Sequence, residues 1–241
     1  MRVCLIGDVH SNLEALNKSI EIIKAEKPDK VFFVGDLVGY GANPSECIML
    51  AREKFDVLIA GNHDYVASGA QRCENFNPQA EQAVNWTSER LSFEEKNFLS
   101  SLPLIYEKND ICLVHASLPR PEEWRYLFDL NEVENTAKYA SGRLIFVGHS
   151  HIPMILEISG EIIKRKANPE QQLKKNVRYI INVGSIGQPR DGDPRICMVF
   201  YDEESNTLEF QRHEYNIKTA QNKILDAGLP EMLALRLGFG K

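Results

Sequence analysis

Five of the six histidines in this sequence follow short apolar runs, and aspartate or asparagine accompanies most of them. The polar set comprises Asp8, His10, Asp36, Asn62, His63, Asp64, His115, His149 and His151. A ligand set of carboxylate, imidazole and amide groups, without thiolates, suits a reactive site for Mn, Fe, Zn or Ni better than it suits a structural zinc site. A carboxylate such as Asp36 can bridge two cations, and such a pair activates water and stabilises an in-line displacement. These residue types therefore predict a dinuclear metal centre with hydrolytic chemistry.

Buried strands are predicted to precede these residues. The runs 3–6, 31–34 and 57–60 are short, apolar and followed by glycine, which is typical of strands in a parallel sheet. A helical pattern at 13–23 separates the first two runs, and a helix start at 43–46, with Asn43 as the predicted cap, separates the second and third. This βαβαβ order predicts a parallel sheet whose carboxyl edge gathers the polar residues that follow each strand.

The rest of the chain is predicted to complete a single domain. We expect a helical insertion at about 65–101, because the strand pattern stops there and helix-start signals replace it. Further strands are predicted at 105–106, 111–114 and 144–147, and the last part of the chain is predicted to hold hairpins and edge strands followed by two helices. The predicted hairpin and edge segments are 155–159 with 161–164, 179–183, and 196–201 with 208–212, and the helices are 219–227 and 231–237.

Composition and charge argue against a nucleic-acid-binding or membrane protein. The net charge of −6 gives no field-driven attraction to polynucleotide or to an anionic membrane, so we expect no stable nucleic-acid or membrane binding. No apolar stretch has the length of a membrane-spanning helix. The five cysteines are scattered and form no C-x-x-C pair, which indicates thiols in a reducing compartment and predicts a cytoplasmic protein.

Five ordered motifs resemble those of the calcineurin-like metallophosphoesterases. They are Gly7-Asp8-Val9-His10, Gly35-Asp36, Gly61-Asn62-His63-Asp64, His115 and Gly148-His149-Ser150-His151, and they span residues 7–151. The resemblance implies an α/β fold with four layers, in which two sheets pack between helices. It also implies two divalent metal ions and the hydrolysis of phosphate esters.

The resemblance assigns a role to each motif residue. Asp8, His10 and His151 would hold one metal ion, Asn62, His115 and His149 the other, and Asp36 would bridge the two. His63 would face the phosphate, either as proton donor to the leaving group or as an electrophile that stabilises the transition state. Asp64 would orient His63, because a carboxylate on one imidazole nitrogen fixes the tautomer of the ring.

A finer resemblance points to a bacterial and archaeal branch of predicted phosphodiesterases, related to the YfcE-type enzymes. It rests on segments 36–44, 85–87 and 182–195. This branch implies a small phosphodiester or nucleotide-type substrate and attack by a hydroxide that bridges the metals. A phosphomonoesterase or a protein Ser/Thr phosphatase is the alternative within the enzymes. A non-catalytic metal-binding scaffold is the alternative outside them, although every predicted ligand is present.

Several residues have a simpler structural interpretation beside a functional one. Asp64 could cap the following helix, and Asn12 could be a helix cap as readily as a substrate contact. Arg120 and Arg190 are candidate phosphate ligands, since a guanidinium matches phosphate oxygens. Tyr40 could stack on a flat leaving group, although packing is the simpler role. The apolar helix at 231–237 packs internally or forms a contact between copies of a homo-oligomer.

Overall fold

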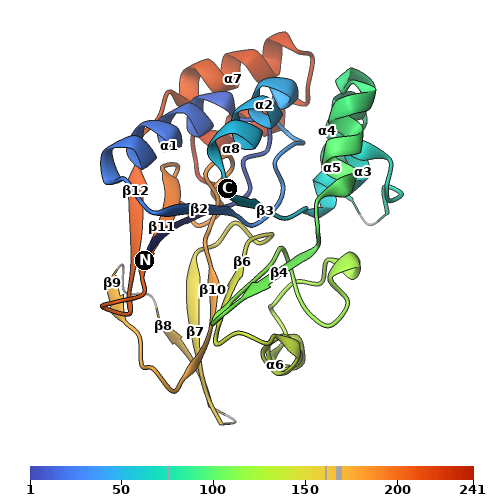
Figure 1. The fold of residues 1–241 in the computed structure, drawn as a ribbon. Helices are drawn as coiled ribbons and strands as arrows, with labels where there is room; N and C mark the ends of the chain where they lie inside the picture. The colour runs from blue at the N-terminus through green and yellow to red at the C-terminus, as the bar shows by residue number, and fades with distance from the viewer. Residues whose placement is uncertain (75, 161, 167–169) are drawn as a thin grey trace.

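The computed structural model describes residues 1–74, 76–160, 162–166 and 170–241. Two six-stranded sheets face one another, and helices cover their outer faces, which gives four layers (Figure 1). The predicted fold class is therefore confirmed. None of the helices in the described part of the chain combines the length and the hydropathy that crossing a membrane requires.

The first sheet has the strand order β3-β2-β1-β11-β12-β9. Its strands are β1 (Arg2–Ile6), β2 (Lys30–Phe33), β3 (Val57–Leu58), β9 (Glu170–Gln172), β11 (Ile196–Asp202) and β12 (Thr207–His213). Strands β1, β2 and β3 run parallel as predicted, so the segments that follow them meet at one edge. The helices over this sheet are α1 (Leu13–Glu26), α2 (Pro44–Lys54), α7 (Ile217–Asp226) and α8 (Glu231–Leu237) (Figure 1).

The second sheet has the order β4-β5-β6-β10-β7-β8. Its strands are β4 (Ile105–Lys108), β5 (Ile111–Val114), β6 (Leu144–Val147), β7 (Met154–Ser159), β8 (Ile162–Lys166) and β10 (Arg178–Asn182). Helix α6 (Leu130–Tyr139) packs on its outer face, where Val133 and Ala137 join the apolar cluster of that side. Between the sheets, side chains such as Leu5, Phe146 and Tyr179 are fully buried in one apolar core.

One prediction about strand position was wrong, and two predicted hairpins are confirmed. The segment predicted at 179–183 is β10, an interior strand parallel to β6 and not an edge strand. The predicted hairpins are β7 with β8 and β11 with β12, and β11 also pairs with β1 in the middle of its sheet. Strands β10 and β11 are almost wholly buried. A short apolar run shows that a strand is buried but not which neighbours it has, and this is why the edge assignment failed. Glu161, in the predicted hairpin, lies outside the described residues.

The insertion consists of α3 (Asn62–Ser68), α4 (Pro78–Arg90) and α5 (Phe93–Ser101), and a 3-10 turn at Pro121–Glu123 follows later in the chain. The predicted caps at Asn77 and Ser92 form, since each side-chain oxygen accepts a hydrogen bond from the third residue of its helix. The predicted cap at Asn43 does not form, because its side chain donates to Glu46 instead.

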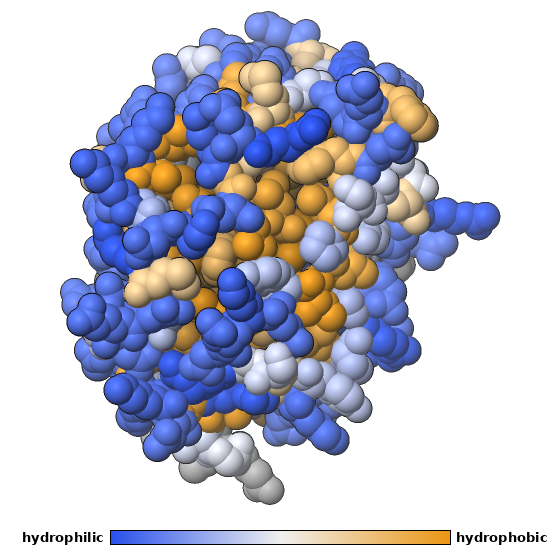
Figure 2. Space-filling view, in the orientation of Figure 1, coloured by the Kyte–Doolittle hydropathy of each residue, from blue (hydrophilic) through white to orange (hydrophobic). Residues whose placement is uncertain are grey.

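The surface reflects these layers. In the orientation of Figure 1, apolar side chains gather across the middle of the molecule, where the two sheets lie, and hydrophilic side chains dominate above and below them (Figure 2). Helices α1 and α2 bury apolar residues against the first sheet, whereas α4, α7 and α8 also bury apolar residues against one another.

Candidate metal centre

The structure brings all seven predicted metal ligands together. Asp8, His10 and Asp36 follow strands of the first sheet, Asn62 begins α3 after the short strand β3, and His115, His149 and His151 follow β5 and β6 of the second sheet. All seven side chains are buried; the most accessible of them, that of His149, is only 8% exposed. The carboxyl ends of strands from both sheets therefore converge on one polar cluster.

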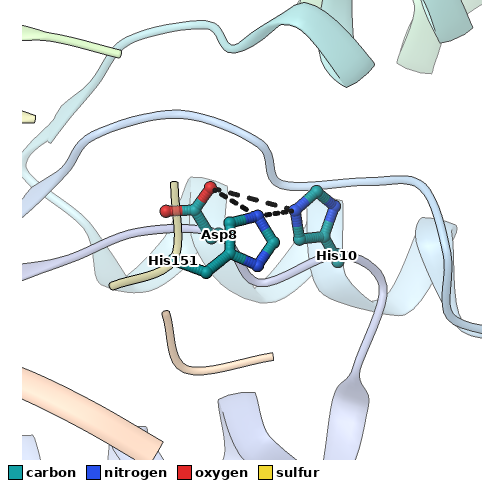
Figure 3. Close-up of side chains that lie close together, drawn as sticks. All are labelled: Asp8, His10 and His151. Atoms are coloured by element: carbon teal, nitrogen blue, oxygen red, sulfur yellow. Dashed lines mark hydrogen bonds and ion pairs between the residues drawn. The ribbon is translucent and has the colours of Figure 1, made fainter. Parts of the chain in front are cut away.

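Asp8, His10 and His151 form the first group of candidate ligands (Figure 3). Their donor atoms converge: His151 Nε2 lies 3.3 Å from Asp8 Oδ1, and His10 Nε2 lies 3.1 Å from His151 Nε2. Two imidazole nitrogens and a carboxylate oxygen at these separations can bind a common cation.

Asp36, His115 and His149 form the second group, and Asp36 also belongs to a third group with His10 and His63. Asp36 Oδ2 lies 3.3 Å from His115 Nε2 and 3.6 Å from His10 Nε2, so one oxygen faces ligands of both groups. Asn62 lines the same cleft as Asp36 and His149. The carboxylate of Asp36 therefore lies where a bridge between two cations would have to be.

Backbone carbonyls set the tautomers of three of these histidines. The Nδ1 atoms of His10, His115 and His151 lie 3.1, 2.8 and 2.6 Å from the carbonyl oxygens of Val38, Val34 and Gln188. Because a carbonyl can only accept, Nδ1 carries a proton in each ring, and in the neutral rings of His10 and His151 Nε2 keeps its lone pair. The carbonyls thus aim three Nε2 atoms into the cluster, as second partners of metal-bound histidines do.

Several buried polar atoms in the cluster have no hydrogen-bond partner among the described residues. They are Asp8 Oδ2, Asn62 Oδ1, His63 Nδ1, His115 Nε2 and His149 Nε2. A buried polar atom without a partner costs about 1–3 kcal/mol. Divalent cations would satisfy the ligand atoms at once, so the donor set of carboxylate, imidazole and amide fits two such ions.

Burial keeps most of these imidazoles neutral. Removal from water disfavours the charged ring and lowers the pKa of His149 to about 3 and that of His63 to about 4. The pKa values of His10 and His151 are lowered for the same reason. Neutral imidazole is the form that binds a metal ion, so these side chains are already in the ligating state.

Without a cation, protons balance the carboxylates. Burial alone would lower the pKa of His115, but the charge of Asp36 outweighs it and raises that pKa to about 9. Burial would raise the pKa of Asp36, but the positive charge on His115 outweighs it and holds that pKa far below its usual range. Burial also raises the pKa of Asp8 to about 8. The centre therefore carries positive charge in the form of protons that metal ions would displace.

The backbone that presents the ligands is strained. Asp8, His10, Asp36, His149 and His151 all have positive φ angles, between 49° and 64°. Such conformations cost on the order of 1–3 kcal/mol each in residues other than glycine and cluster at functional sites. Glycines make room beside them: a Cβ at Gly61 would overlap Asp36 Oδ1, and one at Gly148 would come within 2.5 Å of Asp8 Oδ2.

Asp64 does not orient His63 through its ring, so that prediction was wrong. Its Oδ1 accepts from the backbone N–H groups of Leu37 and Val38, and its Oδ2 accepts from those of Asp36 and Gly61. The capping interpretation was correct in part, because Gly61 is the residue before α3. Asp64 thus fastens the loop that carries Asp36 to the start of α3.

His63 lies beside the cluster, between aromatic rings. Its ring centroid is 4.8 Å from that of His10, 4.5 Å from Tyr40 and 4.7 Å from Phe76. Its backbone N–H donates to Asp36 Oδ1 over 2.9 Å. Packing and this backbone bond, instead of a carboxylate partner, hold the imidazole at the wall of the cleft.

The three candidate substrate contacts lie in different surroundings. Arg190 lines the cleft, where it donates to Gln188 and to the hydroxyl of Tyr40, and its Nε has no partner among the described residues. Tyr40 is buried and packs on His10 and His63, so packing is its evident role. Arg120 lines a separate pocket and pairs with Glu123, so the structure does not bring it to the cluster. Asn12 caps α1.

A cleft of about 460 Å³ opens over the cluster. Its walls include three aromatic residues that the sequence did not single out, Phe76, Trp124 and Tyr126. The ring of Tyr126 stacks on His149 with a centroid distance of 4.1 Å. The local sequence gives no periodic pattern that could have identified these residues, since Trp124 and Tyr126 lie in the irregular segment 116–129.

Comparison with known proteins agrees with this geometry. The sequence model of the calcineurin-like phosphoesterase superfamily domain matches residues 1–206. An uncharacterized protein of Methanocaldococcus jannaschii is 41% identical over 243 residues, covering 99% of this chain and 98% of the relative. The crystal structure of a metallophosphoesterase from Sphaerobacter thermophilus has a TM-score of 0.87 and 35% identity, covering 100% of this chain and 99% of that one.

A more distant match is limited to part of the chain. The symmetrical bis(5'-nucleosyl)-tetraphosphatase of Coxiella burnetii is 34% identical over 122 residues, which cover 48% of this chain and 41% of the relative. The matched segment therefore spans less than half the length of that enzyme.

The four hydrogen bonds of Asp64 lead to a prediction about stability. Asp64→Asn keeps the size of the side chain but replaces one acceptor oxygen by a donor that faces two N–H groups. We expect the free energy of unfolding of the metal-free protein to fall by about 3 kcal/mol, and metal affinity to fall with it, because two bonds to a charged acceptor are lost. Urea denaturation measures the change, with the exposed Asp226→Asn as control. Unchanged stability with altered pH dependence of turnover would instead support the role of orienting His63.

Proposed function

Because the chain belongs to the calcineurin-like phosphoesterase superfamily, we propose that it is a metal-dependent phosphodiesterase for a small phosphodiester or nucleotide-type substrate. The observation that carries this proposal is the position of Asp36 between two groups of ligands. The complete set of ligands also argues against a non-catalytic scaffold, which could lose one without consequence.

The metal ions, when bound, supply an activated water molecule and neutralise charge on the phosphoryl oxygens. The chain contributes the remaining functions. The buried ligands and their backbone partners fix the positions of the ions, and the cleft admits one ester group above them. Arg190 is the cationic side chain best placed for a phosphate oxygen, because its Nε lies buried without a partner among the described residues.

His63 would donate a proton to the departing oxygen. Proton donation requires the imidazolium form, which the negative charge of a bound phosphate would favour over the neutral ring that burial maintains in its absence, and no described residue accepts a hydrogen bond from Nδ1. Tyr40 and Phe76 exclude water from two sides of the ring. A positioned acid of this kind contributes roughly 10²–10⁴-fold to the rate when the leaving group is poor.

The charge around the cleft favours a diester over a monoester. Glu74, Glu122 and Glu123 line the cleft, and Glu123 pairs with Arg125 at the same wall. A diester carries one negative charge and a monoester up to two, so the glutamates repel the monoester more strongly. The same repulsion disfavours a polynucleotide chain. We also propose the cytoplasm as the site of action, since the five cysteines are free thiols.

Steady-state assays test the reaction and the ester class together. We expect the protein to hydrolyse bis-p-nitrophenyl phosphate only with Mn, Fe, Zn or Ni added, and with higher kcat/KM than p-nitrophenyl phosphate. Asp36→Ala should lower kcat/KM by at least about 10³-fold, because it removes the ligand shared by both groups, whereas the exposed Asp226→Ala should not change it. A preference for the monoester would instead indicate a phosphomonoesterase or a protein phosphatase.

The proton-donor role of His63 predicts a dependence on the leaving group. His63→Ala should lower kcat by roughly 10²–10⁴-fold for an alkyl ester but by about tenfold or less for the p-nitrophenyl ester, since p-nitrophenolate leaves without a proton. His213→Ala is the matched control, because His213 lies on β12 away from the cluster. Equal losses with both leaving groups would contradict proton donation and favour an electrophilic role in the transition state.

A further inference from the structure

Tyr40 carries a hydroxyl group that its packing does not require. The residue is 6% exposed, and its ring lies 4.5 Å from each of the imidazoles of His10 and His63, measured between ring centroids. A phenylalanine could fill the same space without burying a hydroxyl, which is costly when it lacks a hydrogen-bond partner. The hydroxyl of Tyr40 has such a partner in Nη2 of Arg190, at 3.3 Å. The contact with Arg190 therefore distinguishes tyrosine from phenylalanine at this position.

Neutral groups hold the guanidinium of Arg190. Its Nη2 has two hydrogens, and it donates both to the hydroxyl of Tyr40 and, over 2.9 Å, to Oε1 of Gln188. The guanidinium carbon also lies 5.6 Å from the centroid of the Tyr40 ring, which is within the range of a cation–π interaction. The tyrosine thus contacts the guanidinium through its hydroxyl and through its ring.

The charge of Arg190 remains available to an anion. Arg125, the other arginine that lines the cleft, pairs with Glu123 and Glu132. In the described part of the chain, Arg190 forms no such pair, and its buried Nε has no hydrogen-bond partner. A hydroxyl and an amide oxygen fix a guanidinium in place without neutralising it, whereas a carboxylate does both. Arg190 is therefore held at the cleft with its charge intact and its Nε–H group unused.

The loop around Tyr40 fits closely against the two histidines. Tyr40 has a left-handed backbone conformation, with a φ angle of 55°. A Cβ at Gly39 would overlap His63 Nδ1, and one at Gly41 would overlap the carbonyl oxygen of His10. The N–H group of Gly41 donates to that same carbonyl over 3.0 Å. The ring is therefore fixed before any ligand binds, which reduces the entropy lost when its hydroxyl directs a neighbouring group.

Helices α7 and α8 support both partners of the contact. Tyr40 belongs to the apolar cluster that these two helices form with α4. The loop after Arg190 is joined to the same part of the chain, because the N–H group of Gly192 donates to the carbonyl of Gly240 over 2.9 Å. Both helices follow residue 206, where the match to the family model ends. The Tyr40–Arg190 contact thus depends on a part of the chain outside the matched domain.

We propose that Tyr40 is a positioning residue for Arg190, whose guanidinium it holds where it can bind a phosphoryl oxygen at the metal centre. This inference rests on the proposed function, in which Arg190 binds the phosphate, and adds the residue that makes this contact effective. If Tyr40 acts only through Arg190, removal of its hydroxyl has an effect only while Arg190 is present. A direct contact between the hydroxyl and the ligand would have an effect in either case.

A double-mutant cycle on phosphate binding separates these two cases. Inorganic phosphate is titrated calorimetrically into the Mn²⁺-loaded native protein, Tyr40→Phe, Arg190→Ala and the double variant. Tyr40→Phe keeps the ring and its packing, and we expect it to raise the dissociation constant about tenfold, because a hydrogen bond to a charged group is lost. Arg190→Ala should raise it at least as much. In the Arg190→Ala background, Tyr40→Phe should change the dissociation constant by less than about twofold.

Tyr201→Phe is the matched control, because it removes a buried hydroxyl that donates to Asn206 from a strand position opposite Val3, near the start of β1. It should leave phosphate binding as in the native protein. An affinity unchanged by Tyr40→Phe, or a loss that persists in the Arg190→Ala background, would overturn the positioning role. Absence of phosphate binding by the native protein would overturn it together with the role of Arg190. Hydrolysis of bis-p-nitrophenyl phosphate by the same preparations shows separately whether the proposed reaction occurs.

Discussion

The structure depends on the burial of one carboxylate, that of Asp36, among histidines from both sheets. Its Oδ2 faces His10 and His115, and its Oδ1 accepts the backbone N–H of His63. A charge so far from water is tolerated only when cations or protons surround it. The lowered pKa of Asp36 and the raised pKa of His115 show the protons in that role. Two divalent ions would replace them and give the centre its chemistry.

The surrounding loops hold the Asp36 carboxylate and the other ligands in place although their backbone conformations are strained. Five ligands have left-handed backbone conformations, and carbonyls and amides of neighbouring loops fix them there. Because the ligands come from loops of two sheets, the packing of Leu5 and Phe146 between those sheets determines how closely Asp8 approaches His151. Stability of the core and geometry of the site are therefore linked, and much of the strain is located where the metal ions would bind.

The sequence predicted which polar residues lie together, because each of them follows a strand and the family resemblance orders the motifs. Each ligand follows a short buried strand, and the carboxyl ends of strands in an open α/β sheet meet at one edge whatever helices and loops connect them. The role of Asp64 could not be predicted in this way, because its four partners are backbone N–H groups, which every residue except proline carries. The interior positions of β10 and β11 and the stack on Tyr126 depend on contacts between segments far apart in the chain, which periodicity does not encode.

Anomalous X-ray diffraction from crystals grown with Mn²⁺ tests most directly whether Asp36 bridges two metal ions. We expect two anomalous peaks, one on each side of the Asp36 carboxylate and roughly 3.5–4 Å apart. The first should be adjacent to Asp8 and His151, and the second adjacent to His115 and His149. A single peak, or two peaks neither of which contacts Asp36, would contradict the bridging role of Asp36.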